Sequence, residues 1–486
     1  MDWTSRVIAS LKWSASARLA SQLLSWLATL VVIRLLAVTD YGLMAIAMIF
    51  IGLAEIVKDL GLTQAIIQRT AVSDAQLAAA RGFTILTGVF LFALLFVAAR
   101  PIAAFFDAPN AVAVLRVLAV QFLFMPLGII EYAMLSRALD FKRISLVELV
   151  ASLCGIGVSL GLALAGAGVW ALVGASVTRQ VLNSLGYWRS QPVKVGVSFR
   201  LSLVVPLLRF GMLMSVNRLA WMLKGSLVNL FIGKLLSTEA LGRYTVARDL
   251  STLPVARVMP ILNGVLFPAF SSIQDDPQRI ARSLAFTAGA ALTFFIPLLW
   301  GLAMVAPVFV PLVLGAQWVG AVPVLQILSA FVPVAAPTFL LPAIFNARGM
   351  PQRSLEMVLA GGGLTLAAIL IAYPYGLEGI ALAMGLADSC LLVFALYRVA
   401  GVIAIRRRVL LRAMWPAFAA GAVMAAALFG LDRVVDRWPN PILELGAKIA
   451  LGGLVYCLAR WLFDRKSVAH YVQLVRRRAA PPVNGL

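Results

Sequence analysis

The sequence predicts an all-α integral membrane protein of about 14 transmembrane helices. They are expected to form two pseudo-symmetric six-helix lobes plus two C-terminal helices around a central cavity. Of the 486 residues, 62% are hydrophobic and 13% are charged, whereas soluble domains carry about 25% charged residues. The apolar residues form continuous runs of about 20 residues, the length that crosses a bilayer as a helix. Because these runs do not alternate with polar residues, spanning strands are not expected.

A short repeat predicts the two lobes. The segment Arg34–Gly42 reads RLLAVTDYG, and Lys234–Gly242 reads KLLSTEALG. Both have a cation, two leucines, a short polar turn, an acid and a final glycine. Each copy joins the first two apolar runs of its half. Such paired halves are typical of transporters that bind their substrate near the middle of the membrane.

The apolar runs divide the chain into groups of six, six and two. We expect an N-terminal lobe at 1–190, a C-terminal lobe at 201–400, two additional helices within 409–465 and a basic cytoplasmic tail at 466–486. The predicted spans are 14–38, 41–62, 80–100, 111–136, 145–165, 168–188, 205–236, 241–270, 280–306, 321–346, 352–374, 377–400, 413–431 and 441–463.

The distribution of Lys and Arg predicts the topology. With the N-terminus in the cytoplasm, the inner links and both termini contain most of the 41 basic residues. Cytoplasmic loops of membrane proteins carry such an excess, so both termini are expected inside. The outer links are short and contain few basic residues, namely Arg100, Lys234, Arg243, Arg433 and Arg437.

Composition also narrows the functional classes. The net charge of +21 is spread between apolar runs, which favours contact with anionic membrane lipids over nucleic acid. The three cysteines show neither a disulfide framework nor a metal-ligand spacing, and His470 is the only histidine. No metal, cofactor or catalytic residue is therefore expected. Prolines within several spans, Pro126 among them, predict kinked helices.

Several basic residues fall inside predicted spans, where an ionisable group normally faces a wet cavity or a partner. A cavity with several cations suits an anionic substrate, and guanidinium groups make paired hydrogen bonds to phosphate oxygens. The alternative is that these side chains extend to the lipid headgroups. The candidate substrate-binding residues are Arg18, Arg179, Arg218, Lys224 and Arg248.

Fewer acids lie in or at the ends of the spans. A carboxyl group in a dry environment binds a proton more readily, so such a group can couple transport to an ion. Glu55 and Asp59 are four residues apart on one helix face, and a structural cluster is the alternative there. The candidate coupling residues are Glu55, Asp59, Glu131, Glu148, Glu356 and Asp388.

A series of short motifs resembles one transporter superfamily. In chain order they are Ile33–Leu36, Asp40–Gly42, Asp59–Leu62, Ala65–Arg69, Leu139–Lys142, Gly168–Val173, Leu241–Tyr244, Leu266–Ser271 and Leu314–Trp318. Their order and spacing over roughly residues 15–400 resemble the multidrug/oligosaccharidyl-lipid/polysaccharide flippase superfamily, in its polysaccharide exporter branch of Wzx-type lipid-linked oligosaccharide flippases. Many relatives have an acid just before the position of Asn229, where this chain has Val228.

The resemblance implies 12 to 14 helices in two lobes around a cationic cavity. It also implies that the substrate is an undecaprenyl-pyrophosphate-linked oligosaccharide, moved from the inner to the outer leaflet of a bacterial inner membrane for exopolysaccharide, capsule or O-antigen synthesis. A monomer in contact with membrane lipids is expected, and the polymerase and chain-length machinery are further candidate partners.

Two alternatives remain. A multidrug or cation antiporter of the same superfamily would favour an acidic cavity, whereas the charges within these spans are mostly positive. A membrane glycosyltransferase using the same lipid carrier would need acids on a sizeable outer loop, and Asp40 lies in a link of only a few residues. The sequence therefore favours transport over catalysis.

Overall fold

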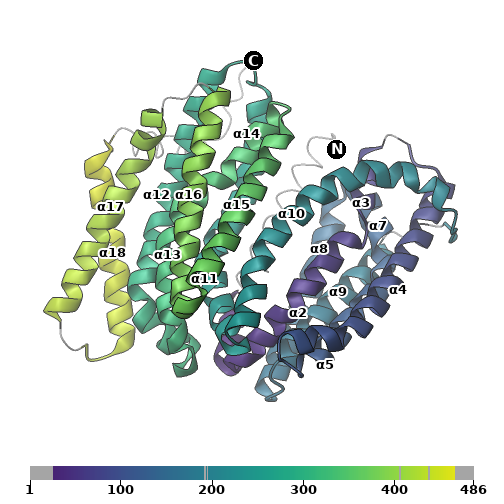
Figure 1. The fold of residues 1–486 in the computed structure, drawn as a ribbon, viewed down its shortest axis with the longest axis horizontal. Coiled ribbons are helices and arrows are strands. Elements are labelled where there is room, and N and C mark those ends of the chain that lie inside the picture. The colour runs from purple at the N-terminus through teal and green to yellow at the C-terminus, as the bar shows by residue number, and fades with distance from the viewer. Residues whose placement is uncertain are drawn as a thin grey trace. The chain divides into compact units, whose positions relative to one another are not determined.

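The computed structural model describes residues 26–69, 71–190, 193, 195–403, 407–435 and 438–465. It describes the backbone alone at 209–218, 265, 267, 268, 351, 402 and 407. In this part of the chain the regular structure is entirely helical, as Figure 1 shows. The chain forms two compact units, Met1–Thr245 and Val246–Leu486.

The first described helix of the first unit is the short helix Trp26–Leu35. The helices that follow are α2 (Val38–Val57), α3 (Leu62–Gln68), α4 (Asp74–Phe105), α5 (Ala111–Ala119), α6 (Gln121–Phe124), α7 (Pro126–Arg137), α8 (Phe141–Leu164), α9 (Trp170–Ser190), the 3-10 turn η1 (Leu201–Leu203) and α10 (Val205–Leu235). In this unit α8 packs along α9, α7 packs on α9 and α3, and α10 packs on α2 and α3.

The helix α11 (Thr238–Ser271) begins in the first unit and ends in the second. The rest of the second unit contains α12 (Pro277–Phe309), η2 (Val310–Leu314), η3 (Ala316–Ala321), α13 (Val322–Ala335), η4 (Ala336–Leu340), α14 (Leu341–Ala347), α15 (Pro351–Ala372), η5 (Tyr373–Tyr375), α16 (Gly376–Ile403), α17 (Arg407–Val434) and α18 (Pro441–Phe463). Here α17 packs on α12 and on α18, and α16 packs on α13 and α15.

These helices coincide with the predicted spans from 41–62 onward, so the expected all-α membrane fold is confirmed. Eight described segments are long and apolar enough to cross a membrane. One of them, Gln352–Gly401, contains both α15 and α16. The bent pair Ala111–Phe124 and Pro126–Arg137 would add one more span. The total of 14 spans and the lobe boundaries remain predictions.

Helix starts follow local sequence signals. Ser73 and Gln76 form a capping box at the start of α4. Asp276 accepts a hydrogen bond from the amide of Arg279 and precedes Pro277 at the start of α12. Both patterns satisfy amides that a helix start leaves without partners. The axis bends by 52° where Pro126 begins α7, which confirms the predicted kink at this proline.

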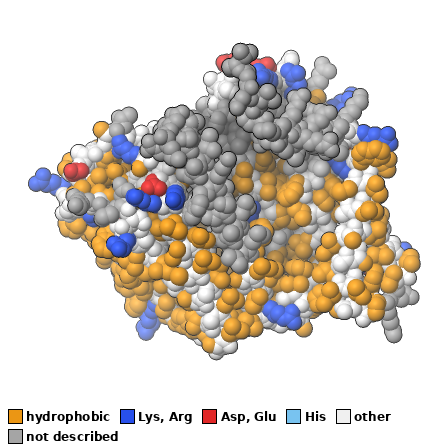
Figure 2. Space-filling model, turned by 180° about the vertical axis from the view of Figure 1, so that it is seen from behind, with side chains coloured by type: hydrophobic (Ala, Val, Ile, Leu, Met, Phe, Trp, Pro, Cys, Tyr) orange, Lys and Arg blue, Asp and Glu red, His pale blue; other side chains and the backbone are white. Residues whose placement is uncertain are grey.

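Each unit has its own apolar core. In the first unit, Leu62, Ile66, Ile130 and Leu207 bring together α3, α7 and α10 near the predicted inner face. In the second, a larger cluster joins α11, α12, α14 and α16 around residues such as Phe295. The described outward surface is also rich in apolar side chains, which are spread over the lower part of the face in Figure 2. A lipid environment explains this exposure, since in water such a surface would drive association.

Candidate substrate-binding and coupling residues

The two copies of the sequence repeat meet at the predicted outer end of the first unit. A Cβ atom placed on Gly42 would overlap the carbonyl oxygen of Thr238, and one placed on Gly242 would overlap the carbonyl oxygen of Val38. The contact is reciprocal, because each glycine faces the fifth residue of the other copy, where the helix of that copy begins. Such self-complementary pairing is typical of two-fold related surfaces. Only glycine allows the starts of α2 and α11 to approach this closely.

Two further contacts hold this end together. The Asp40 carboxylate accepts a hydrogen bond from the Ala37 amide at 3.0 Å, so it caps the start of α2. Lys234, the cation of the second repeat copy, forms an ion pair with Asp107 at 3.0 Å (Nζ to Oδ2). Its ammonium group lies 5.2 Å from the centre of the Phe105 ring. The repeat is therefore a structural element at the outer ends of α2, α10 and α11.

The structure describes the five candidate substrate-binding cations to different extents. Arg18 lies outside the described residues, and Arg218 lies on α10 where only the backbone is described. Lys224, nearly two turns further along α10, is half-buried with its ammonium group 5.9 Å from the centre of the Trp221 ring. Arg248 is half-buried on α11, and its carbonyl oxygen accepts hydrogen bonds from the hydroxyls of Ser251 and Thr252.

Arg179 has a different environment from Lys224. It is exposed on α9, on the side that packs on α8, because a Cβ atom on Gly155 would lie 3.5 Å from the Arg179 Cβ. Helix α10, with Lys224, packs on α2 and α3. These contacts place Arg179 beside α8, and they place Lys224 on a helix that packs on α2 and α3. A common substrate site for all five residues stays a prediction.

Glu55 of α2 and Asp59, which follows this helix, have local structural contacts. Glu55 forms an ion pair with Lys58 one turn later. Asp59 is buried, and its carboxylate accepts a hydrogen bond from the Gly61 amide at 3.2 Å. Leu60 and Gly61 both have positive φ angles there, so Asp59 stabilises the tight turn between α2 and α3. These contacts are those of a structural cluster, which was the alternative to ion coupling for this pair of acids.

Glu131 is the most deeply placed of the candidate acids. Its side chain is fully buried on α7, and Oε1 lies 2.6 Å from Nη2 of Arg81 on α4. The same guanidinium donates hydrogen bonds to the carbonyl oxygens of Val195 at 2.7 Å and Val193 at 3.2 Å. Oε2 of Glu131 is buried with no hydrogen-bond partner. Arg81 thus ties the link between α9 and α10 to α4 and α7.

The remaining acids lie on three other helices. Glu148 on α8 accepts a hydrogen bond of 3.5 Å from the Tyr187 hydroxyl. Glu356 on α15 forms ion pairs with Arg398 and, at 3.5 Å, with Arg353. Asp388 is half-buried on α16. Ion coupling by any of these acids stays a prediction.

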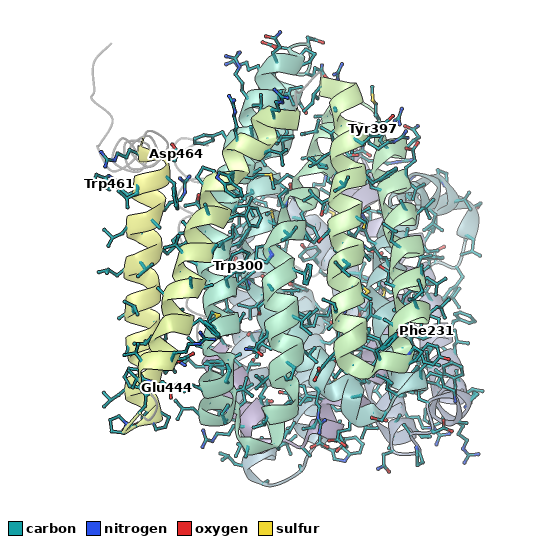
Figure 3. All side chains as sticks on the ribbon, turned by 60° about the vertical axis from the view of Figure 1, so that its left-hand side comes forward. Phe231, Trp300, Tyr397, Glu444, Trp461 and Asp464 are labelled. Carbon is teal, nitrogen blue, oxygen red and sulfur yellow. The ribbon has the colours of Figure 1, made fainter. Side chains whose placement is uncertain are left out.

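Two buried cations on α18 were not singled out from the sequence. Lys448 lies 2.6 Å from Asp432 of α17 and 2.7 Å from Glu444. Arg460 donates a hydrogen bond to the Thr293 hydroxyl of α12 at 3.2 Å. Glu444 and Asp464, the acid paired with Arg460, lie near opposite ends of α18 (Figure 3). The sequence feature that could have indicated these ion pairs is the spacing of each basic residue four positions from an acid on the same helix.

Some polar groups in the spans have no partner among the described residues. The side-chain oxygens of Asn183, Asn229 and Asn263 are buried without a hydrogen bond. Buried polar atoms normally find partners, so these three amides are further candidates for contact with a ligand. The described residues contain no cluster of three or more His, Cys, Asp or Glu side chains that could hold a metal ion.

The fold and these groups define a class. The long apolar helices are those of a multi-pass membrane protein, and charged groups within such helices are usually functional. The chain belongs to the family described as "Polysaccharide biosynthesis protein", whose model matches residues 31–323. This match confirms the resemblance to the polysaccharide branch of the flippase superfamily.

Named relatives come from different bacteria. The chain is 28% identical to the lipopolysaccharide biosynthesis protein WzxC of Escherichia coli, over 68% of this chain and 67% of WzxC. It is 28% identical to the teichuronic acid biosynthesis protein TuaB of Bacillus subtilis, over 67% of this chain and 68% of TuaB. The succinoglycan biosynthesis transport protein ExoT of Rhizobium meliloti is 23% identical over 96% of both chains.

Solved structures support the fold. The lipid II flippase MurJ in an inward closed conformation superposes with a TM-score of 0.75 at 15% identity, over 94% of this chain and 99% of that one. An inward-facing multidrug resistance MATE transporter gives 0.58 at 17% identity, over 78% and 95%. At this level of identity, the similarity establishes the fold.

Proposed function

We propose that this protein is a flippase that moves undecaprenyl-pyrophosphate-linked oligosaccharide units from the inner to the outer leaflet of a bacterial inner membrane. The observation that carries the proposal is the family match over residues 31–323. It is supported by relatives named for three different polysaccharides. Movement would follow alternating access between two states, with no bond made or broken. Both chain termini would lie in the cytoplasm.

The candidate cations suit the head of this substrate. A pyrophosphate carries several acceptor oxygens, and Arg and Lys side chains form their strongest hydrogen bonds with such charged groups. Arg218 and Lys224 are on α10, and Arg248 is on α11, the helix that extends into both units. We assign these three residues, with Arg18 and Arg179, to substrate binding. The sugars of the oligosaccharide would be recognised by residues other than these five.

The glycosyltransferase alternative depends on an available outer acid. Asp40 is the acid that the sequence offers, and its carboxylate is engaged as the cap of α2. The antiporter alternative shares the fold, as the MATE structure illustrates. The experiment below separates it from the flippase.

The test is transport in a bacterial strain that lacks its own flippase. Wild-type protein should restore surface polysaccharide. Arg218→Ala and Lys224→Ala should cause lipid-linked units to accumulate, because each loses a charged hydrogen bond of about 1.5–3 kcal/mol, which weakens substrate binding by about 10- to 150-fold. Arg116→Ala is the matched control, since Arg116 is half-buried like Lys224, stacks 4.4 Å from the Phe96 ring centre and donates a hydrogen bond to the Phe96 carbonyl.

Each outcome has a clear consequence. If the two α10 variants transport as well as wild type at equal membrane abundance, these cations do not bind substrate. If the wild type relieves no accumulation of any lipid-linked unit but lowers drug sensitivity, the antiporter replaces the flippase.

A further inference from the structure

The second unit contains an open groove near its predicted inner face. The groove has a volume of about 400 Å³ and lies between the end of α11 and the start of α12. Leu266, Phe270 and Ile273 line it from the α11 side, and Arg282 and Phe286 line it from α12. The volume falls in the range of pockets that hold small organic ligands. We call this cavity the α11–α12 groove.

The lining of the α11–α12 groove changes from charged to apolar with increasing depth in the membrane. Helix α12 begins at Pro277, so with a rise of 1.5 Å per residue Arg282 lies about 8 Å along the helix and Phe286 about 14 Å. Phe286 is 39% exposed. The groove therefore has a cation near the membrane surface and apolar side chains deeper in the hydrocarbon. A lipid with a charged head has the same arrangement, with its charge at the membrane surface and its apolar chain deeper in the hydrocarbon.

The charge of Arg282 is not compensated in the described part of the chain. Its side chain is exposed, and no described carboxylate or carbonyl bonds it. The nearby acid Asp276 instead caps the start of α12 through the amide of Arg279. Arg282 thus keeps its hydrogen-bond donors available at the edge of an apolar groove.

We propose that the α11–α12 groove is a waiting site for the pyrophosphate lipid on the inner leaflet, before transport. The pyrophosphate binds Arg282, and the polyprenyl chain follows Phe286 and Leu266. This inference rests on the proposed function and adds a second substrate contact outside the candidate cation set.

The pyrophosphate lipid fits this site better than an ordinary phospholipid. Lipid tails are as apolar as the groove, so apolar contact alone selects no particular lipid. Selection must come from the guanidinium, which bonds two phosphate oxygens at once. A pyrophosphate offers more charge and more acceptor oxygens than the single phosphodiester of a phospholipid.

The test is site-specific crosslinking in the full-length protein. The photoreactive residue p-benzoylphenylalanine replaces Phe286, and the protein is placed in nanodiscs of phosphatidylglycerol and phosphatidylethanolamine with added undecaprenyl pyrophosphate. Mass spectrometry then identifies the attached lipid. Phe294 is the matched position, because it lies about two turns deeper on α12 and is also exposed. We expect undecaprenyl pyrophosphate to be enriched at least fivefold at position 286 relative to position 294.

The role of the Arg282 charge is tested in the protein that carries p-benzoylphenylalanine at position 286. Arg282→Gln should reduce that enrichment about fivefold, whereas Arg279→Gln, an exposed arginine outside the groove lining, should not. Ser283→Phe should also reduce it, because the larger side chain fills the groove while Arg282 remains. Equal crosslinking to phosphatidylglycerol would show a bulk-lipid groove and overturn the proposal, as would equal losses in the two arginine variants.

The waiting site and the flippase activity fail in different ways. If wild-type protein restores polysaccharide and Arg282→Gln leaves crosslinking unchanged, the waiting site is wrong and the flippase stands. If the wild type relieves no accumulation of lipid-linked units, the proposed function is wrong whatever lipid the groove holds.

Discussion

At the residue scale, Arg81 is the clearest case of a charge whose role depends on distant chain segments. In the sequence it lies at the start of the predicted span 80–100, the end that the topology places toward the cytoplasm. The structure adds a buried carboxylate 50 positions later and two carbonyl oxygens 112 and 114 positions later. One guanidinium thereby joins α4, α7 and the link before α10. Replacing Arg81 should therefore remove contacts with both α7 and the link before α10.

We predict that Arg81→Met destabilises the protein by about 3–5 kcal/mol, because it leaves the fully buried Glu131 carboxylate without its counter-charge. The double variant Arg81→Met, Glu131→Leu should recover part of this loss, since it removes both charges. The measurement is thermal unfolding in detergent, followed by tryptophan fluorescence.

Arg116→Met is the control for this prediction, because Arg116 is a half-buried arginine that stacks on an aromatic ring of a neighbouring helix. It should change stability little. A double variant less stable than Arg81→Met alone would contradict the role of the buried ion pair.

At the scale of elements, the close crossing of α2 and α11 depends on two glycines. An added methyl group on Gly42 would overlap the backbone of Thr238, and one on Gly242 would overlap the backbone of Val38. Backbone atoms cannot move aside as a flexible side chain can. The starts of the two helices would have to separate.

We predict that Gly42→Ala and Gly242→Ala each cost about 1–3 kcal/mol of stability, the usual cost of overpacking. The double variant should cost less than the sum, because the first substitution already separates the helices. Gly157→Ala is the control, since nothing lies within 4 Å of its added Cβ and alanine favours a helix by about 0.5–1 kcal/mol. Full additivity in thermal unfolding would argue against a shared contact.

The elements also show what the sequence can and cannot predict. Helix positions follow from local hydropathy, so spans such as 441–463 match α18 (Pro441–Phe463). Contacts between segments distant in the chain have no local signal. The repeat around Gly42 and Gly242 was visible, but nothing in either copy indicated that the two touch. Likewise, Glu55 and Asp59 shared a helix face, yet the turn at Leu60 and Gly61 that engages Asp59 was not predictable from spacing.

At the scale of the whole molecule, the basic residues and the apolar surface must fit one orientation in the membrane. The link between α8 and α9 contains Gly166 and Gly168, both with positive φ angles, and has no basic residue. The link between α11 and α12 leads into Arg279 and Arg282. The excess of positive charge on the cytoplasmic side therefore predicts that the first link is outside and the second is inside.

We predict that a cysteine at Ala165 reacts with a membrane-impermeant maleimide in intact cells, whereas a cysteine at Ser272 reacts only after permeabilisation. Both positions are exposed at helix ends. The native cysteines Cys154, Cys390 and Cys457 lie within α8, α16 and α18 and are first replaced by alanine, which also provides the unlabelled control. Labelling of the Ser272 position in intact cells, with the Ala165 position protected, would reverse the topology. The α11–α12 groove would then face the outer leaflet, where it could not receive a lipid substrate made inside the cell.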